Sequence, residues 1–269
     1  MSTSSTADRG LVLSVAELDL VRDDGVTLVR GLSLELAAGE TLGIVGESGS
    51  GKSLTLRSVL GIQPECVTRH GEIVCNVRAA MVFQEPATAL NPTMRVGDLV
   101  ASTWRLHHPG CSKATARAAA ADLFEQVGID NAVRRLRAWP HELSGGLRQR
   151  VMIAAALATE PELLLCDEPT TALDVRVQAQ ILTLLRRLVD ERGMAMVFVS
   201  HDLAVVSRVC ERILVMRDGR HVESGPIDRV LAAPAEQYTR DLLAANLARR
   251  LADRTGVAEP DLTAEGALR

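Results

Sequence analysis

A glycine-rich segment at residues 46–53 has the residue types and the spacing that bind phosphate groups. It fits the pattern G-x-x-x-x-G-K-[ST], with the residues Gly46, Glu47, Ser48, Gly49, Ser50, Gly51, Lys52 and Ser53. Its glycines let successive backbone N–H groups point inward around phosphates, and the helix expected after it adds its positive end. We therefore expect the loop to hold ATP, with Lys52 at the β- and γ-phosphates and the Ser53 hydroxyl on Mg²⁺.

The choice of lysine at position 52 supports this interpretation. Of the 30 lysine and arginine residues, only Lys52 and Lys113 are lysines. A compact ammonium here indicates a place that a forked guanidinium would not fit. The alternative is a flexible glycine loop without a ligand. The loop lies, however, between the apolar run 41–45 and an expected helix at 54–60, which favours phosphate binding.

A second group of candidates follows an apolar run at residues 163–166. Asp167 and Glu168 come directly after this run, at the edge of a sheet where ligands of α/β proteins bind. We expect Asp167 to hold Mg²⁺, directly or through water, and Glu168 to polarise the attacking water. Neighbouring strand residues point to opposite faces, so the two roles require a turn, with which Pro169 is consistent. The alternative is a strand end whose acids are simply solvated.

A third group begins a predicted helix over residues 145–158. Ser144 is suited to cap this helix, Gly145 and Gly146 expose its first backbone N–H groups, and Gln149 follows one turn later. This would be a second anion site on the same chain, which a simple kinase or GTPase does not need. Taken alone, the segment is also compatible with an ordinary capped helix.

The elements that must position these residues alternate between strand and helix. Alternating apolar and polar residues predict two strands within 11–40, and the sequence over 90–160 reads mostly as helix. The remaining expected elements are a strand at 163–166, a helix at 175–191, a strand at 195–199, a helix near 203–211, a strand at 212–216 and helical, polar sequence over 225–269. This order predicts a parallel α/β core with a helical insertion.

The composition of the 269-residue chain argues against several classes of protein. Hydrophobic residues make up 47%, which predicts a packed core, and a formal net charge of −4 argues against a nucleic-acid-binding protein. The longest apolar run, 151–158, is too short to cross a membrane, and the N-terminus does not resemble a signal peptide. Five cysteines without a Cys-x-x-Cys pair favour a cytosolic compartment.

Along the chain the motifs come in the order 46–53, 144–149 and 163–168. In that order they resemble the motifs of the ATP-binding subunits of ABC transporters. The resemblance covers residues 11–245 and implies a P-loop NTPase (RecA-like) fold. Such a fold has a parallel-sheet core, an N-terminal antiparallel β subdomain and an inserted α-helical subdomain, here at about 90–160. Residues 1–10 would be a flexible N-terminus and 246–269 a C-terminal tail. The further family positions are Gln84 in the Q-loop, Asp174 in the D-loop and the switch histidine His201.

Four segments are similar to those of dipeptide, oligopeptide and nickel importers, namely residues 84–92, 140–142, 148–151 and 238–243. The similarity implies import of peptides or nickel, powered at the cytoplasmic face of the cell membrane. The implied partners are a second ABC ATPase subunit (the same chain or a paralogue), two transmembrane permease subunits and, indirectly, an extracytoplasmic substrate-binding protein. Two alternatives are a nucleotide-binding regulatory module and a soluble ABC-type ATPase of DNA repair or translation. Repair relatives carry long insertions and translation relatives carry two ATPase halves, and this sequence shows neither.

In such proteins two subunits pair head to tail and bury two ATP molecules between them. The residues that would contact ATP bound by the other subunit are Ser144, Gly145, Gly146 and Gln149. Asp174 would communicate across the interface. Catalytic roles are implied for Glu168, His201 and Gln84, and Mg²⁺ contacts for Ser53, Gln84 and Asp167.

Two features depart from the family pattern. Relatives place an aromatic ring under adenine near the end of the first strand, whereas this chain has no aromatic residue before Phe83. Base–aromatic stacking contributes roughly 1–3 kcal/mol, so either ATP binds more weakly or the Arg22 guanidinium stacks on the base. The stretch between Ile73 and Met81 is also shorter than in relatives, which bears on the antiparallel subdomain near the nucleotide.

Overall fold

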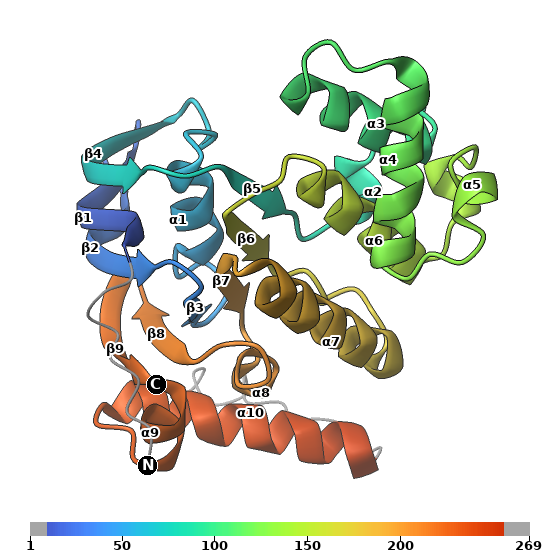
Figure 1. Ribbon diagram of the computed structural model, residues 1–269. Helices are drawn as coiled ribbons and strands as arrows, with labels where there is room; N and C mark the ends of the chain where they lie inside the picture. Colours follow the sequence, from blue (N-terminus) through green and yellow to red (C-terminus); the bar gives the residue numbers. More distant parts are fainter. Residues whose placement is uncertain (1–9, 256–269) are drawn as a thin grey trace.

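The computed structural model describes residues 10–255 of the chain. Residues 1–9 of the expected flexible N-terminus and residues 256–269 of the expected tail lie outside the described residues. Figure 1 shows the described chain as a β-rich part that contains two sheets, with a helical lobe beside it.

A six-stranded sheet forms the core of the β-rich part. Its strand order is β5-β6-β7-β3-β8-β9; β9 runs antiparallel to β8, and the other neighbouring pairs are parallel. The strands are β3 (Thr41–Val45), β5 (Ala79–Val82), β6 (Leu163–Asp167), β7 (Ala195–Ser200), β8 (Arg212–Arg217) and β9 (Arg220–Pro226). The adjacent strands β6, β7 and β3 are buried throughout, as their apolar runs predict. Their carboxyl ends share one edge, which brings the segments that follow them together.

A smaller antiparallel sheet packs against this core. Its order is β2-β1-β4, and its strands are β1 (Leu11–Arg22), β2 (Thr27–Ala37) and β4 (Val67–Cys75). Inward-facing residues such as Leu18, Leu20 and Leu32 are fully buried in a cluster shared with Ile44 of the main sheet. Residues 76–78 alone connect β4 to β5, so the short segment seen in the sequence accompanies a complete three-stranded subdomain.

The helical lobe is inserted between β5 and β6 (Figure 1). It contains α2 (Pro86–Ala89), α3 (Val96–His107), α4 (Lys113–Gln126), α5 (Ala132–Arg135), a 3₁₀ turn (Pro140–Glu142) and α6 (Gly145–Leu157). Phe124, Leu136 and Ile153 are buried where these helices meet. The parallel core, the antiparallel subdomain and the helical insertion together confirm the expected fold class.

The other helices accompany the main sheet. They are α1 (Lys52–Val59), α7 (Val175–Arg192), α8 (Leu203–Val206), α9 (Ile227–Ala232) and α10 (Gln237–Thr255). In Figure 1, α9 and α10 lie beneath β8 and β9, and α10 extends past α8. Within residues 10–255, no helix combines the length and the apolar character needed to cross a lipid bilayer.

Two expected elements are wrong in detail. Helical structure does not begin at residue 225, because 220–226 form β9, an edge strand whose mostly polar sequence alternates too weakly to be recognised. The helix expected near 203–211 stops at Val206, because the following residues turn into β8.

Candidate nucleotide site

The phosphate loop turns sharply between β3 and α1, and two of its positions require glycine. Gly46 has φ = 156°, and a Cβ added there would lie 2.1 Å from the carbonyl oxygen of Met216. Gly51, which precedes α1, has φ = 94°, and its Cβ would lie 2.6 Å from the Val29 side chain. The backbone of the loop therefore packs directly against β8 and β2, at two positions where the loop has no room for a side chain of its own.

The Lys52 ammonium lies across the phosphate loop. Its Nζ donates to the carbonyl oxygens of Gly46 (2.8 Å) and Glu47 (2.6 Å) and to the Ser50 hydroxyl (3.2 Å). Lys52 is only 4% exposed. Burial lowers the pKa of its ammonium, and the nearby carboxylates of Glu168 and Asp167 oppose that shift. The loop thus orients a buried cation with its own oxygen atoms.

Ser53 and Asp167 meet at the start of α1 and the end of β6. Ser53 Oγ donates to Asp167 Oδ1 at 2.6 Å. The second carboxylate oxygen, Asp167 Oδ2, is buried and has no hydrogen-bond partner among the residues that the structure describes. Burial raises the pKa of Asp167, against the lowering effect of the Ser53 hydrogen bond. A hydroxyl and an unshared carboxylate oxygen are ligands that Mg²⁺ prefers, so the two residues fit that ion.

Three side chains converge on Oε2 of Glu168. Thr171 Oγ1 donates to it at 2.8 Å, Gln84 Nε2 donates at 3.4 Å, and His201 Nδ1 lies 3.3 Å away. We call Gln84, Glu168, Thr171 and His201 the Glu168 cluster. The hydrogen bond with His201, and after it that from Thr171, holds the pKa of the Glu168 carboxyl below its ordinary value, although burial opposes this. The carboxylate is therefore ionised at neutral pH and able to orient a water molecule.

The turn that the neighbouring carboxylates require is present at the end of β6. Glu168 has φ = 43°, in the left-handed region, and its N–H donates to the carbonyl of Val199 in β7 at 3.1 Å. Asp167 can therefore face Ser53 while Glu168 meets His201. Sequence reasoning missed Thr171, whose signal was its place three residues after Glu168 in this turn.

The residues of the third motif lie in the helical lobe, and Figure 1 shows α6 well separated from α1. Ser144 caps α6 by accepting a backbone N–H at 3.4 Å, and a Cβ on Gly146 would lie 2.6 Å from Val177 of α7. Gln149 is buried, and its Nε2 has no hydrogen-bond partner in the described part of the chain. Asp174 caps α7, with its Oδ1 2.9 Å from the N–H of Val177. One copy of the chain thus assembles the first two motifs, but not the third.

Arg22, the candidate for stacking on adenine, is paired with a neighbouring acid. Its Nε and Nη2 donate to the Asp24 carboxylate at 2.7–3.0 Å, and both side chains are about half exposed. These paired hydrogen bonds hold the guanidinium plane at the turn between β1 and β2. Stacking on a base stays a prediction.

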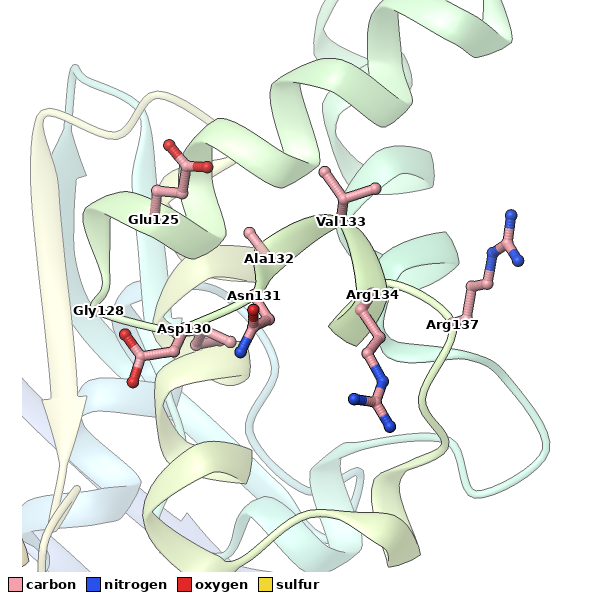
Figure 2. A pocket seen from close by; sticks show the side chains of 9 residues that line it. Glu125, Gly128, Asp130, Asn131, Ala132, Val133, Arg134 and Arg137 are labelled. Atoms are coloured by element: carbon pink, nitrogen blue, oxygen red, sulfur yellow. The ribbon is translucent and has the colours of Figure 1, made fainter.

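An open hollow of 770 Å³ lies in the helical lobe, outside the nucleotide site. Figure 2 shows its lining at the end of α4 and in α5, with Glu125 and Asp130 toward one side and Arg134 and Arg137 toward the other. The residues that line it include none of the predicted site residues. It is therefore not part of the phosphate chemistry.

A family model described as ABC transporter matches residues 29–171, which is more than half of the chain. The chain belongs to the ABC transporter family. The matched range of this ABC protein contains the phosphate loop, Gln84, Ser144, Asp167 and Glu168, whereas Asp174 and His201 lie beyond it. The resemblance drawn from the motifs is thereby confirmed.

Several known ABC proteins are similar over most of this chain. The glutathione import ATP-binding proteins GsiA of Salmonella typhimurium and Escherichia coli (strain K12) are each 42% identical over 272 residues, covering 91% of this chain and 44% of GsiA. The chain thus spans less than half the length of these curated relatives.

Among solved structures, the dimeric ATP-binding cassette MJ0796 in a post-hydrolysis state with ADP and Pi is 27% identical. It has a TM-score of 0.70 and covers 80% of this chain and 98% of its own. An inward-facing ABC transporter of metal-chelate type is 26% identical, with a TM-score of 0.73 and coverage of 88% and 90%.

Proposed function

We propose that this chain is the ATP-hydrolysing subunit of an ABC import system that takes up peptides or nickel. The observation that carries the proposal is the meeting of Lys52, the Ser53–Asp167 pair and the Glu168 cluster at the carboxyl ends of β3, β6 and β7. A cation for phosphates, oxygen ligands for Mg²⁺ and a base for water are the parts that phosphoryl transfer to water requires. The relatives named for glutathione import support the import direction and favour peptides over nickel.

ATP binding would use the phosphate loop as its cradle. The backbone N–H groups of residues 46–53 surround the phosphates, and Lys52 exchanges its contact with Ser50 for a phosphate oxygen. Ser53 and Asp167 would hold Mg²⁺. Gln84, which donates to Glu168 at 3.4 Å, would be a further contact of the ion. Mg²⁺, when bound, neutralises charge on the phosphates.

Hydrolysis would depend on the Glu168 cluster. Glu168 orients a water molecule for in-line attack on the γ-phosphorus and accepts its proton as the new P–O bond forms and the bond to ADP breaks. His201 lies beside the carboxylate and contacts the γ-phosphate from the end of β7. Thr171 keeps the carboxylate in place.

A second ATPase subunit would complete the site. Ser144, Gly145, Gly146 and Gln149 cap or belong to α6, which Figure 1 shows apart from α1, the helix that follows the phosphate loop. These four residues would contact the nucleotide of a partner. Asp174 at the start of α7 communicates across the same interface. The MJ0796 cassette, a dimer with ADP and Pi, supports this arrangement.

The remaining partners follow from the family. Two transmembrane permease subunits receive the motion of the helical lobe, and an extracytoplasmic substrate-binding protein delivers the cargo to them. The chain would then work at the cytoplasmic face of the cell membrane as a peripheral subunit. Loss of the γ-phosphate contact on hydrolysis would release the pair of ATPase subunits.

The two lysines of the chain allow a matched test of ATP hydrolysis. Lys52→Ala is expected to lower phosphate release by at least about 100-fold, because the buried cation of the loop is lost. Lys113→Ala, which removes an exposed lysine at the start of α4, is expected to release phosphate like the wild type. Equal activity of both variants would contradict the proposed site.

The import function is tested separately. The tagged chain is expected to co-purify with two membrane proteins, and its deletion is expected to abolish growth when defined peptides are the only nitrogen source. A deletion strain that grows normally on peptides and fails only when nickel is limiting would assign nickel as the cargo. Normal growth under both conditions would refute import of either.

A further inference from the structure

The first turn of α10 reaches back to the phosphate loop. Tyr238 is the only tyrosine of the chain and is buried, and its Oη accepts the backbone N–H of Glu47 at 3.3 Å. The Arg217 guanidinium lies over its ring, 4.8 Å from the centroid. A residue 191 positions away in the sequence therefore touches the loop that would hold the nucleotide.

The peptide plane between Gly46 and Glu47 is bonded on both of its edges. Its carbonyl, that of Gly46, accepts from Lys52 Nζ at 2.8 Å, and its N–H, that of Glu47, donates to Tyr238. Because a trans peptide is rigid, fixing the N–H also fixes the direction of the carbonyl. Gly46 itself permits rotation of this plane, so the Tyr238 hydroxyl, which lies outside the loop, adds a second restraint on its orientation beside that of Lys52.

Helix α10 is anchored well enough to provide that orientation. Tyr238, Leu242 and Asn246 are spaced by four residues and therefore share one face of the helix. Leu242 is buried in the core, and Asn246 Oδ1 accepts the N–H of Leu203 at 3.2 Å. Leu203 begins α8, directly after the segment that carries His201. The helix is thus fixed at the phosphate loop and at the segment after β7.

We propose that Tyr238 is a positioning residue for Lys52: its hydroxyl fixes the Gly46–Glu47 peptide, whose carbonyl in turn directs the Lys52 ammonium toward the phosphates. The inference rests on the proposed binding of ATP by residues 46–53. It makes the C-terminal helix part of the nucleotide site, without any contact between Tyr238 and the nucleotide itself.

The test is Tyr238→Phe, which removes the hydroxyl and keeps the ring under Arg217. ATP affinity is measured on the purified full-length chain by titration with a fluorescent ATP analogue. The variant is expected to bind about two- to ten-fold more weakly, the change that one net hydrogen bond produces. The control is Ser102→Ala, which removes an exposed hydroxyl that donates to the Leu99 carbonyl in the helical lobe. It is expected to keep wild-type affinity even where both variants lose the same thermal stability.

A second measurement needs no variant at Tyr238. With tyrosine labelled with ¹³C at Cζ alone, the wild-type chain gives a single Cζ resonance, because it has one tyrosine. ATP is expected to shift this resonance in the wild type and to leave it unchanged in Lys52→Ala. Wild-type ATP affinity of Tyr238→Phe, or an unmoved resonance in a sample that binds ATP, would overturn the inference. A wild-type chain that binds no ATP would instead overturn the proposed function.

Discussion

Replacement of Glu168 by glutamine separates ATP hydrolysis from ATP binding. The substitution keeps the length and shape of the side chain. It replaces the carboxylate that accepts hydrogen bonds from Thr171 and Gln84 and lies beside His201. A neutral amide cannot accept the proton of the attacking water. General-base catalysis contributes about 10²- to 10⁴-fold, so phosphate release is expected to fall by that factor, or by about 3–5 kcal/mol in the barrier.

ATP affinity of Glu168→Gln is expected to change little, by less than about three-fold, because Lys52 is held by oxygen atoms of the phosphate loop rather than by Glu168. Phosphate release and titration with a fluorescent ATP analogue are measured on the same preparation. Glu125→Gln, at an exposed glutamate of the helical lobe, is the matched control and is expected to behave as the wild type. If Glu168→Gln released phosphate at a rate within about ten-fold of the wild-type rate, the assignment of Glu168 as the general base would be refuted.

Three further predictions follow from the same contacts. Thr171→Val removes a donor that keeps the pKa of Glu168 low, so the acid limb of the pH–rate profile is expected to move up by about one pH unit, and an unmoved limb would contradict this. Burial raises the pKa of Asp167, so the folded state binds the proton of this carboxyl more tightly than the unfolded state does. The ionised carboxylate therefore lowers the free energy of unfolding as the pH rises above the ordinary pKa of an aspartate. Without Mg²⁺ at pH 7, Asp167→Asn is therefore expected to melt about 2–4 °C higher in calorimetry while losing activity, and a lower Tm would be the opposing result. Gly46→Ala is expected to abolish ATP binding in equilibrium dialysis, because its Cβ would lie 2.1 Å from a carbonyl of β8, and retained affinity would show that the loop can shift.

The parts of the site that are contiguous in the sequence could be predicted from it. Residues 46–53 and the pair Asp167–Glu168 each follow an apolar run, and the rule that parallel strands end at one edge brings them together. The turn after the strand was predicted because neighbouring strand residues point to opposite faces, but the positive φ of Glu168 was not.

The contacts between distant residues could not be predicted in the same way. The hydrogen bond from the Glu47 N–H to the Tyr238 hydroxyl joins the phosphate loop to α10. No local sequence pattern indicates that Tyr238 contacts this loop. Strand β9 was missed because an edge strand has few buried residues and hence weak alternation, although the preceding Asp218–Gly219 pair is typical of a hairpin turn. Such features depend on tertiary packing, which periodicity does not record.

The central claim is that ATP is held between the phosphate loop of one subunit and the start of α6 in another. Analytical ultracentrifugation of Glu168→Gln with ATP, alone and mixed with a paralogous ATPase subunit, tests it most directly. We predict that ATP converts the 28.9 kDa chain to a dimer, and that adding Ser144→Arg leaves it monomeric although each chain still binds ATP. Equal dimerisation with and without Ser144→Arg, or ATP-bound chains that never pair, would contradict the claim.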